Sequence, residues 1–162
     1  MIRLSRLSDY GIVLMTRLAR EPERALPASV LARESAVSPA MTGKILKLLA
    51  RAELLVSHRG AHGGYALARA PERITIAEII EALDGPIALT SCLRPSAEGC
   101  GIEALCPART NWQRINRAIR DALAEVTLAE MARPVLEFGP APFVSEHASP
   151  AVRDPAALAG TS

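Results

Sequence analysis

All three cysteines of this 162-residue chain lie in one short stretch, residues 89–107, with the spacing C-x7-C-x5-C. The stretch also holds two glycines and two prolines, which are typical of a loop. A lone cysteine is usually a small core residue. Three thiols in one polar loop can converge on one point, and thiolates select iron–sulfur clusters or zinc. The sequence therefore predicts that Cys92, Cys100 and Cys106 are metal ligands.

Charge is distributed unevenly along the chain, although the net charge is only +2. Residues 1–70 carry eleven lysines and arginines against five acidic residues, whereas residues 71–133 carry seven against nine. A basic first half indicates a surface for a polyanion, although a solvated basic surface would have the same composition. Aromatic residues make up 3% of the chain, so the core must consist of Leu, Ile, Val and Ala, which favours helices.

A targeting or membrane segment is not visible in the sequence. The apolar run 11–15 is too short to span a bilayer, and Asp9 and Arg17 flank it closely. It also lacks a small-residue cleavage site. We therefore expect a cytoplasmic protein with no membrane partner, in which thiols stay reduced.

A helix-turn-helix pattern occupies residues 28–51, after a first helix for which Ser8 is the expected cap. A short helix is expected over about 29–35, and Ser38 and Pro39 are typical of the start of the next, over 39–51. Ile45 and its apolar neighbours would face the core, while the opposite face would meet the major groove of DNA. The candidate DNA contacts here are Ser38, Met41, Thr42, Lys44 and Lys47.

A glycine-rich hairpin follows, with expected strands over 54–58 and 65–68. Such a hairpin after a helix-turn-helix is the wing of a winged-helix domain, and its tip contributes the candidate DNA contacts Arg59, Gly60 and His62. A phosphate-cradling loop would need a following Lys-Ser/Thr, which is absent. His58 and His62 lack further metal ligands in the hairpin, so we expect a phosphate contact or exposure to water.

A long amphipathic helix is expected over 110–125, between capping boxes that begin at Thr75 and Thr127. Its apolar stripe could pack on its own domain. A two-fold DNA site instead favours pairing with a second copy, through the candidate dimer residues Trp112, Ile115, Ile119 and Leu123. From residue 134 onward the sequence is rich in Pro, Ala and Ser, which is typical of a disordered tail.

Four segments together resemble the Rrf2 family of winged-helix regulators, which includes the iron–sulfur regulator IscR and the nitric-oxide sensor NsrR. They are residues 3–11 (RLSRLSDYG), 59–65 (RGAHGGY), the cysteine triplet and 126–131 (VTLAEM). The resemblance covers roughly residues 1–133. Residues 57–65, 85–90 and 111–116 look most like the branch that regulates the SUF iron–sulfur assembly system.

The resemblance implies a homodimer with a [2Fe-2S] or [4Fe-4S] iron–sulfur cluster held by the three cysteines and one further ligand. In the IscR type that ligand is a histidine, but the matching residue here is Arg109, which stays protonated and cannot ligate. The first cysteine gap is also longer than in the IscR pattern. In the NsrR type the ligand is an aspartate of the partner subunit, and Asp9 matches it. Glu98 and Glu103 compete as ligands from within the loop.

These features predict a mainly α protein with a winged helix-turn-helix domain, a two-stranded wing and a long C-terminal dimerisation helix. The expected division is 1–86 for DNA binding, 87–109 for the cysteine loop, 110–133 for dimerisation and 134–162 for the tail. We expect an iron–sulfur-dependent transcription regulator of SUF genes that binds double-stranded DNA and has no small-molecule substrate. A nitric-oxide or redox-sensing repressor and a zinc-stabilised module are the alternatives. An enzyme is not expected, because no catalytic constellation is visible.

Overall fold

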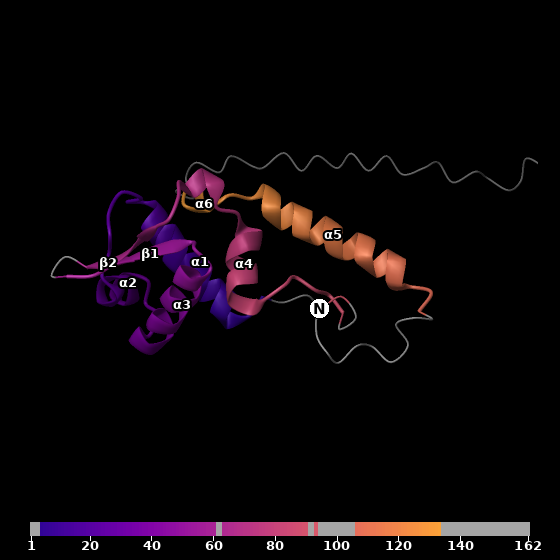
Figure 1. Ribbon diagram of the computed structural model, residues 1–162, viewed down its shortest axis with the longest axis horizontal. Helices are drawn as coiled ribbons and strands as arrows, with labels where there is room; N and C mark the ends of the chain where they lie inside the picture. Colours follow the sequence, from indigo (N-terminus) through magenta and orange to yellow (C-terminus); the bar gives the residue numbers. More distant parts are fainter. Residues whose placement is uncertain (1–3, 61–62, 91–92, 94–105, 134–162) are drawn as a thin grey trace, which may run out of the picture.

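The structure is a computed structural model, and it describes residues 4–60, 63–90, 93 and 106–133. Figure 1 shows the first four helices and the strands gathered at one end, with α5 extending away from them. In chain order the elements are α1 (Arg6–Ala19), α2 (Ala28–Glu34), α3 (Pro39–Arg51), β1 (Leu55–His58), β2 (Gly64–Leu67), the 3-10 helix η1 (Pro71–Arg73), α4 (Ile76–Asp84), α5 (Arg109–Glu125) and α6 (Leu128–Met131). This confirms the predicted helical fold with a small antiparallel wing.

The first helix begins earlier than expected. Ser5 caps α1, and its hydroxyl accepts hydrogen bonds from the N–H groups of Leu7 and Ser8. The prediction that Ser8 is the cap is wrong. Ser8 is fully buried, and its hydroxyl donates instead to the Asp84 carboxylate at 2.6 Å. The local sequence favours Ser8 as a cap, but its hydroxyl is used in a hydrogen bond to the end of α4.

The helix-turn-helix is formed by α2 and α3, which pack against each other. The turn between them contains Ala36 with φ 53°, a left-handed conformation that is uncommon for a residue with a side chain. Ser38 then caps α3 by accepting a hydrogen bond from the Met41 N–H, and Pro39 occupies the first helical position. The predicted bounds of this helix are confirmed.

The wing is anchored to the body by a third backbone segment. β1 and β2 pair from Leu55 opposite Leu67 to His58 opposite Gly64. Leu26 and Tyr65 exchange two backbone hydrogen bonds of 2.9 Å, so the segment before α2 pairs with the other edge of β2. A side chain at Gly64 would meet the Leu26 carbonyl at 2.5 Å, so only glycine permits this close pairing.

We call α1 to α4, the wing and α6 the body. Its core is aliphatic, as the composition predicts, and Leu14, Ile45 and Ile79 are fully buried. α1 packs closely on α4 because Gly11 lacks a side chain. A Cβ there would lie within 2.2 Å of a Leu83 methyl carbon.

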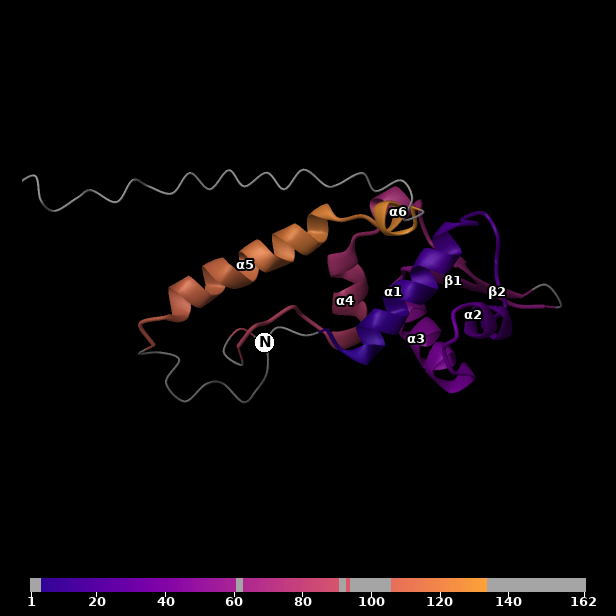
Figure 2. The same ribbon diagram turned by 180° about the vertical axis from the view of Figure 1, so that it is seen from behind.

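We call α5 the arm. Its end near α6 packs against α4, and the rest of the helix projects away from the body (Figure 2). The Arg120 guanidinium pairs with Glu81 at 2.9 Å. Just beyond the arm, the Ile76 N–H donates to the Val126 carbonyl at 3.0 Å. No residue of the arm is buried, whereas Leu128, directly after it, is fully buried in the body.

None of the helices within the described residues has the length and apolar character needed to cross a membrane.

Candidate DNA-binding surface and cysteine loop

The exposed side of α3 presents a row of cations. Lys44, Lys47 and Arg51 are exposed and recur three and four residues apart, which places them on one face of the helix. None of the ion pairs found among the described residues engages these three side chains. Three unneutralised cations on one helix face can contact the phosphates or base edges of a duplex.

Thr42 does not belong to this row. Its side chain is fully buried, and its hydroxyl has no hydrogen-bond partner among the described residues. The expectation that Thr42 contacts DNA is wrong, because it lies one turn before Ile45 and Leu46 and shares their core-facing side. Met41 is half-buried and packs against the core, so only part of its side chain is available.

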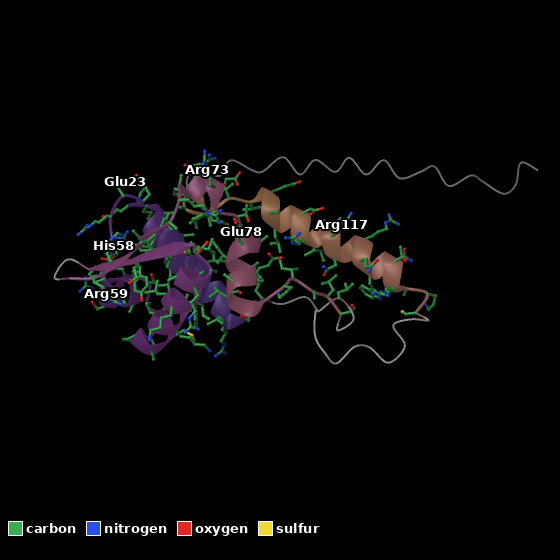
Figure 3. The ribbon with its side chains drawn as sticks, viewed as in Figure 1. Glu23, His58, Arg59, Arg73, Glu78 and Arg117 are labelled. Atoms are coloured by element: carbon green, nitrogen blue, oxygen red, sulfur yellow. The ribbon has the colours of Figure 1, made fainter. Side chains whose placement is uncertain are left out.

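The wing carries two further candidate contacts, His58 at the end of β1 and Arg59 directly after it. His58 and Arg59 are exposed, and Figure 3 shows both at the wing end of the molecule. Gly60 follows with φ 114°, which favours glycine, and its carbonyl accepts a hydrogen bond from the Gly63 N–H at 2.9 Å. This turn reverses the chain directly after Arg59. His62 lies outside the described residues.

The cysteine loop begins and ends against the arm. The Asn116 amide of α5 donates to the Ile87 carbonyl at 2.9 Å, and its oxygen accepts from the Leu89 N–H at 3.0 Å. Cys106 immediately precedes α5 and is half-buried. One helix therefore holds the chain before the first cysteine and after the last. Cys92 and Cys100 lie outside the described residues, as do the competing ligands Glu98 and Glu103.

Asp9, the candidate fourth ligand, is exposed in the first turn of α1. That end of α1 is held to the end of α4, because Ser5 and Ser8 both donate to the Asp84 carboxylate. Cys106 instead adjoins the start of α5, which projects away from the body (Figure 1). Within the described part of the chain, no three His, Cys, Asp or Glu side chains form a metal site. Asp9 and Cys106 thus adjoin different elements, the start of α1 and the start of α5.

The residues of the predicted dimer stripe lie in two different environments. Trp112 and Ile115 are 39% and 46% exposed, whereas Leu123 packs against the core of the body. Ile119 is half-exposed. Arg120 pairs with Glu81 of α4, and Asn116 binds the backbone of residues 87 and 89. Sequence reasoning gave no role to Asn116. A polar residue at the edge of an apolar stripe is the signal that could have identified it.

Comparison with known proteins identifies the family. The profile of the Rrf2 family, described as an iron-dependent transcriptional regulator, matches residues 4–134. The transcriptional regulator CymR of Bacillus subtilis is 31% identical over 81% of this chain and 90% of its own length. IscR of Erwinia tasmaniensis is 28% identical over 80% of this chain and 78% of its own length.

Solved structures agree with the sequence comparisons. The structure of CymR, the global cysteine regulator of B. subtilis, has a TM-score of 0.63 at 30% identity, covering 82% of this chain and 97% of CymR. IscR of T. potens has a TM-score of 0.61 at 27% identity, covering 80% of this chain and 85% of that one. These relatives are transcriptional regulators rather than enzymes, as predicted. The chain therefore belongs to the Rrf2 family of winged-helix transcriptional regulators.

Proposed function

We propose that this protein is a homodimeric transcription regulator whose affinity for operator DNA depends on an iron–sulfur cluster, and that it controls SUF iron–sulfur assembly genes. The observation that carries the proposal is the attachment of both ends of the cysteine loop to α5, together with the free cations on α3 and the wing. A change inside the loop acts directly on the helix that we propose to join two subunits. The division of the chain at residues 86, 109 and 133 is part of the same proposal.

On the DNA side, α3 enters the major groove and the wing reaches an adjacent groove. Lys44 and Lys47 have the exposure and free charge that this requires, and Arg59 has the same properties on the wing. Ser38, Met41, Gly60 and His62 complete the proposed contact set, from which burial removes Thr42. Arginine can donate two hydrogen bonds to a guanine edge, so Arg59 is the candidate for base recognition.

On the cluster side, Cys92, Cys100 and Cys106 are the proposed thiolate ligands. The fit rests on the donor set, because iron–sulfur clusters are held by cysteine thiolates and Cys106 is partly accessible at the start of α5. Asp9 is the proposed fourth ligand. We place it on a second copy, because the start of α1 and the start of α5 lie apart in one chain (Figure 1). When bound, the cluster supplies a redox-active group that iron, oxygen or nitric oxide can alter.

Asn116 is the residue that transmits the state of the loop. It holds the backbone of residues 87 and 89 against the arm, and Arg120 holds the arm to Glu81 of α4. α4 in turn packs on α1 and α3. Cluster occupancy would thus set the position of each α3 relative to its twin, and so the half-site spacing that the dimer accepts.

The DNA part of the proposal is tested with Arg59→Ala. If Arg59 contacts a base, its loss should weaken operator binding by roughly 1–3 kcal/mol. If it contacts only a phosphate, its loss should weaken binding to all DNA sequences alike, and the slope of log affinity against log salt concentration should fall in magnitude by about one. Arg73→Ala is the matched control, because Arg73 is exposed on η1 away from the wing (Figure 3). Fluorescence anisotropy should be run on SUF promoter DNA and on unrelated DNA of equal length. Equal effects of the two substitutions would remove the wing from the interface.

The dimer is tested with Trp112→Asp. A charge without a partner is costly to bury, so this variant should sediment as a monomer and lose operator binding. The body should keep its helical circular dichroism, because Trp112 is 39% exposed and belongs to the arm. A dimeric, DNA-competent variant would contradict the proposed interface.

The cluster is tested by anaerobic purification, with visible absorption and metal analysis. Cys106→Ala should abolish cluster uptake, and Asp9→Ala should retain a cluster with an altered spectrum and faster loss in air, because a carboxylate is a harder iron ligand than a thiolate. A change with Glu98→Ala or Glu103→Ala but not with Asp9→Ala would move the fourth ligand into the loop.

Two alternatives have their own outcomes in the same experiment. A colourless protein with bound zinc would support the zinc-stabilised module. The similarity to Staphylococcus aureus CymR, which has been solved in an oxidized form and is 31% identical, favours the redox-sensing alternative. A colourless, metal-free protein whose DNA affinity changes on thiol oxidation would support it.

A further inference from the structure

An open groove of about 900 Å³ lies where the ends of α1, β2 and α5 meet α6. α6 packs on η1 and on α1, and Figure 1 shows it beside the segment that follows β2. Small or apolar side chains line the groove from two sides, namely Leu67, Ala68, Ala70 and Pro71 from that segment and Ala129 and Ala132 from α6. None of the residues proposed above for DNA, the cluster or the dimer lines it. The groove therefore offers space beside small side chains and has no part in the function proposed so far.

The chain leaves the described part of the structure at this groove. Arg133, the last described residue, lines it. The only two phenylalanines of the chain, Phe138 and Phe143, follow shortly afterwards and lie outside the described residues. An extended chain spans about 3.4 Å per residue, so Phe138 can reach to about 17 Å from Arg133. Large apolar side chains are thus tethered within reach of the groove.

The sequence of residues 134–144 differs from that of the rest of the tail. It reads PVLEFGPAPFV, whereas residues 145–162 contain no aromatic residue and are rich in Ala, Ser and Pro. Segments that stay disordered are poor in aromatic residues. The prolines of 134–144 also favour an extended chain, which limits the conformational freedom lost on docking. The prediction of a disordered tail therefore suits residues 145–162 better than residues 134–144.

We propose that residues 134–138 dock in the groove of their own chain, with Phe138 packed between Ala68 and Ala129. Ala68 is exposed and Ala129 is half-buried, so an aromatic ring there would cover apolar surface that water otherwise meets. The short tether gives the segment an effective concentration on the order of 1 mM, so that even a weak contact is occupied.

The charges agree with this placement. Arg20 lines the groove and is exposed, and none of the ion pairs found among the described residues engages it. Glu137 is the only charged residue within 134–144 and directly precedes Phe138. Docking of Phe138 therefore brings an unpaired anion to the same groove as an unpaired cation.

Fluorine NMR of the full chain tests the proposal. Biosynthetic para-fluorophenylalanine labels Phe138 and Phe143 alone, because the chain has no other phenylalanine, and Phe138→Leu assigns the two signals. The Phe138 signal should be at least about twofold broader than in a synthetic peptide of residues 134–162, because a docked ring moves with the body. Its shift should also change less than that of the peptide between light and heavy water. A Phe138 signal that matches the free peptide would overturn the proposal.

Ala68→Glu places a charge in the groove and should return the Phe138 signal to that of the free peptide. Ala40→Glu is the matched control, because Ala40 is also exposed but lies on α3, outside the groove, and its signal should match the parent chain. Circular dichroism checks that both variants keep the helical fold. A signal that Ala68→Glu leaves unchanged, or that Ala40→Glu changes equally, would overturn the site.

The charged contact provides a second variant that leaves the groove lining intact. Arg20→Glu should narrow the Phe138 signal, and Glu137→Arg in the same chain should restore its width. A double variant no broader than Arg20→Glu alone would contradict the placement of Glu137.

Mixing distinguishes docking within one chain from exchange between two copies. Labelled parent chain is equilibrated with a large excess of unlabelled Ala68→Glu chain. Docking in the same chain keeps the broad Phe138 signal. Loss of that signal would overturn the assignment by showing that the segment occupies the groove of a partner subunit.

Discussion

The body and the arm are helical structures of opposite kinds. The body buries Leu14, Ile45, Ile79 and a set of similar aliphatic residues, and Gly11 lets two of its helices approach closely. The 17-residue arm buries none of its residues and is held by polar contacts to α4 and to the backbone of residues 87 and 89. Most helical stability in proteins comes from packing of an apolar face. The body therefore carries its own apolar packing, whereas the arm has an exposed apolar face for which we propose a second copy of the chain.

The largest expected effect comes from truncating matched isoleucines in the two regions. Ile45→Ala in the body should lower the free energy of unfolding by about 2–5 kcal/mol, because Ile45 is fully buried. Ile115→Ala in the arm should lower it by less than about 1 kcal/mol, because Ile115 is 46% exposed. Urea unfolding at several protein concentrations separates folding of the chain from dimer formation. Equal losses in dilute protein would show that the arm is part of the core.

A pair of glycines sharpens the comparison within the body. Gly64→Ala should cost about 1–3 kcal/mol, because its Cβ would meet the Leu26 carbonyl at 2.5 Å and disrupt the wing anchor. Gly43→Ala in α3 has no atom within 4 Å of the new Cβ and should instead add about 0.5–1 kcal/mol of stability. Thermal unfolding should show a lower midpoint for Gly64→Ala and a higher midpoint for Gly43→Ala than for the parent chain. A stabilising Gly64→Ala would show that the wing is not held by Leu26.

The link between arm and loop is tested by Asn116→Leu. This change removes two hydrogen bonds and leaves the Leu89 N–H without its partner, which should cost about 1–2 kcal/mol locally. Amide exchange at Leu89 should become roughly tenfold faster, while exchange in α3 stays unchanged. Asn116→Asp retains the acceptor oxygen and should protect Leu89 better. Unchanged exchange in the leucine variant would rule out the tether.

The smallest effect is a pH dependence of the capping box before α4. Burial raises the pKa of Glu78, but hydrogen bonds from Thr75 and Arg69 outweigh it and leave the pKa below its ordinary value of 4.5. Its stabilisation is therefore complete above about pH 4.5 and is lost as the pH falls through the folded-state pKa.

Glu78→Gln should cost less than about 1 kcal/mol at pH 7, because the carboxylate is 38% exposed and water screens its charge. The difference from the parent chain should disappear under acid conditions in urea unfolding. A difference that persists at pH 3 would contradict the charge argument.

Local sequence signals predicted the elements whose ends depend on local chemistry. Ser38 with Pro39 marks the start of α3, and the capping boxes at Thr75 and Thr127 mark the starts of α4 and α6. The glycines of the wing indicated a hairpin because their backbone turns require them. These interactions span at most a few residues and can be read from one segment.

Features that depend on distant contacts could not be read in this way. Ser8 satisfies the pattern for a cap, yet its hydroxyl binds Asp84, 76 residues away. Thr42 is polar, yet the rotation of α3 against the body buries it beside Ile45 and Leu46. Asn116 acquires its role only when the chain returns past residues 87 and 89. In each case a tertiary contact decides the environment of a polar side chain.

The attachment of α5 to α4 also has a mechanical meaning. A 17-residue helix is about 25 Å long, and its far end is fixed to the body by the Val126–Ile76 backbone bond. For a rigid lever of about that length, a tip displacement of about 4 Å corresponds to a rotation of about 10° at the fixed end. The proposed ligand Cys106 lies just before the tip of this lever, and the Arg120–Glu81 pair holds the lever to α4. In the cluster-dependent mechanism proposed above, a displacement of a few ångströms at the tip would be converted into a rotation of the entire DNA-binding body.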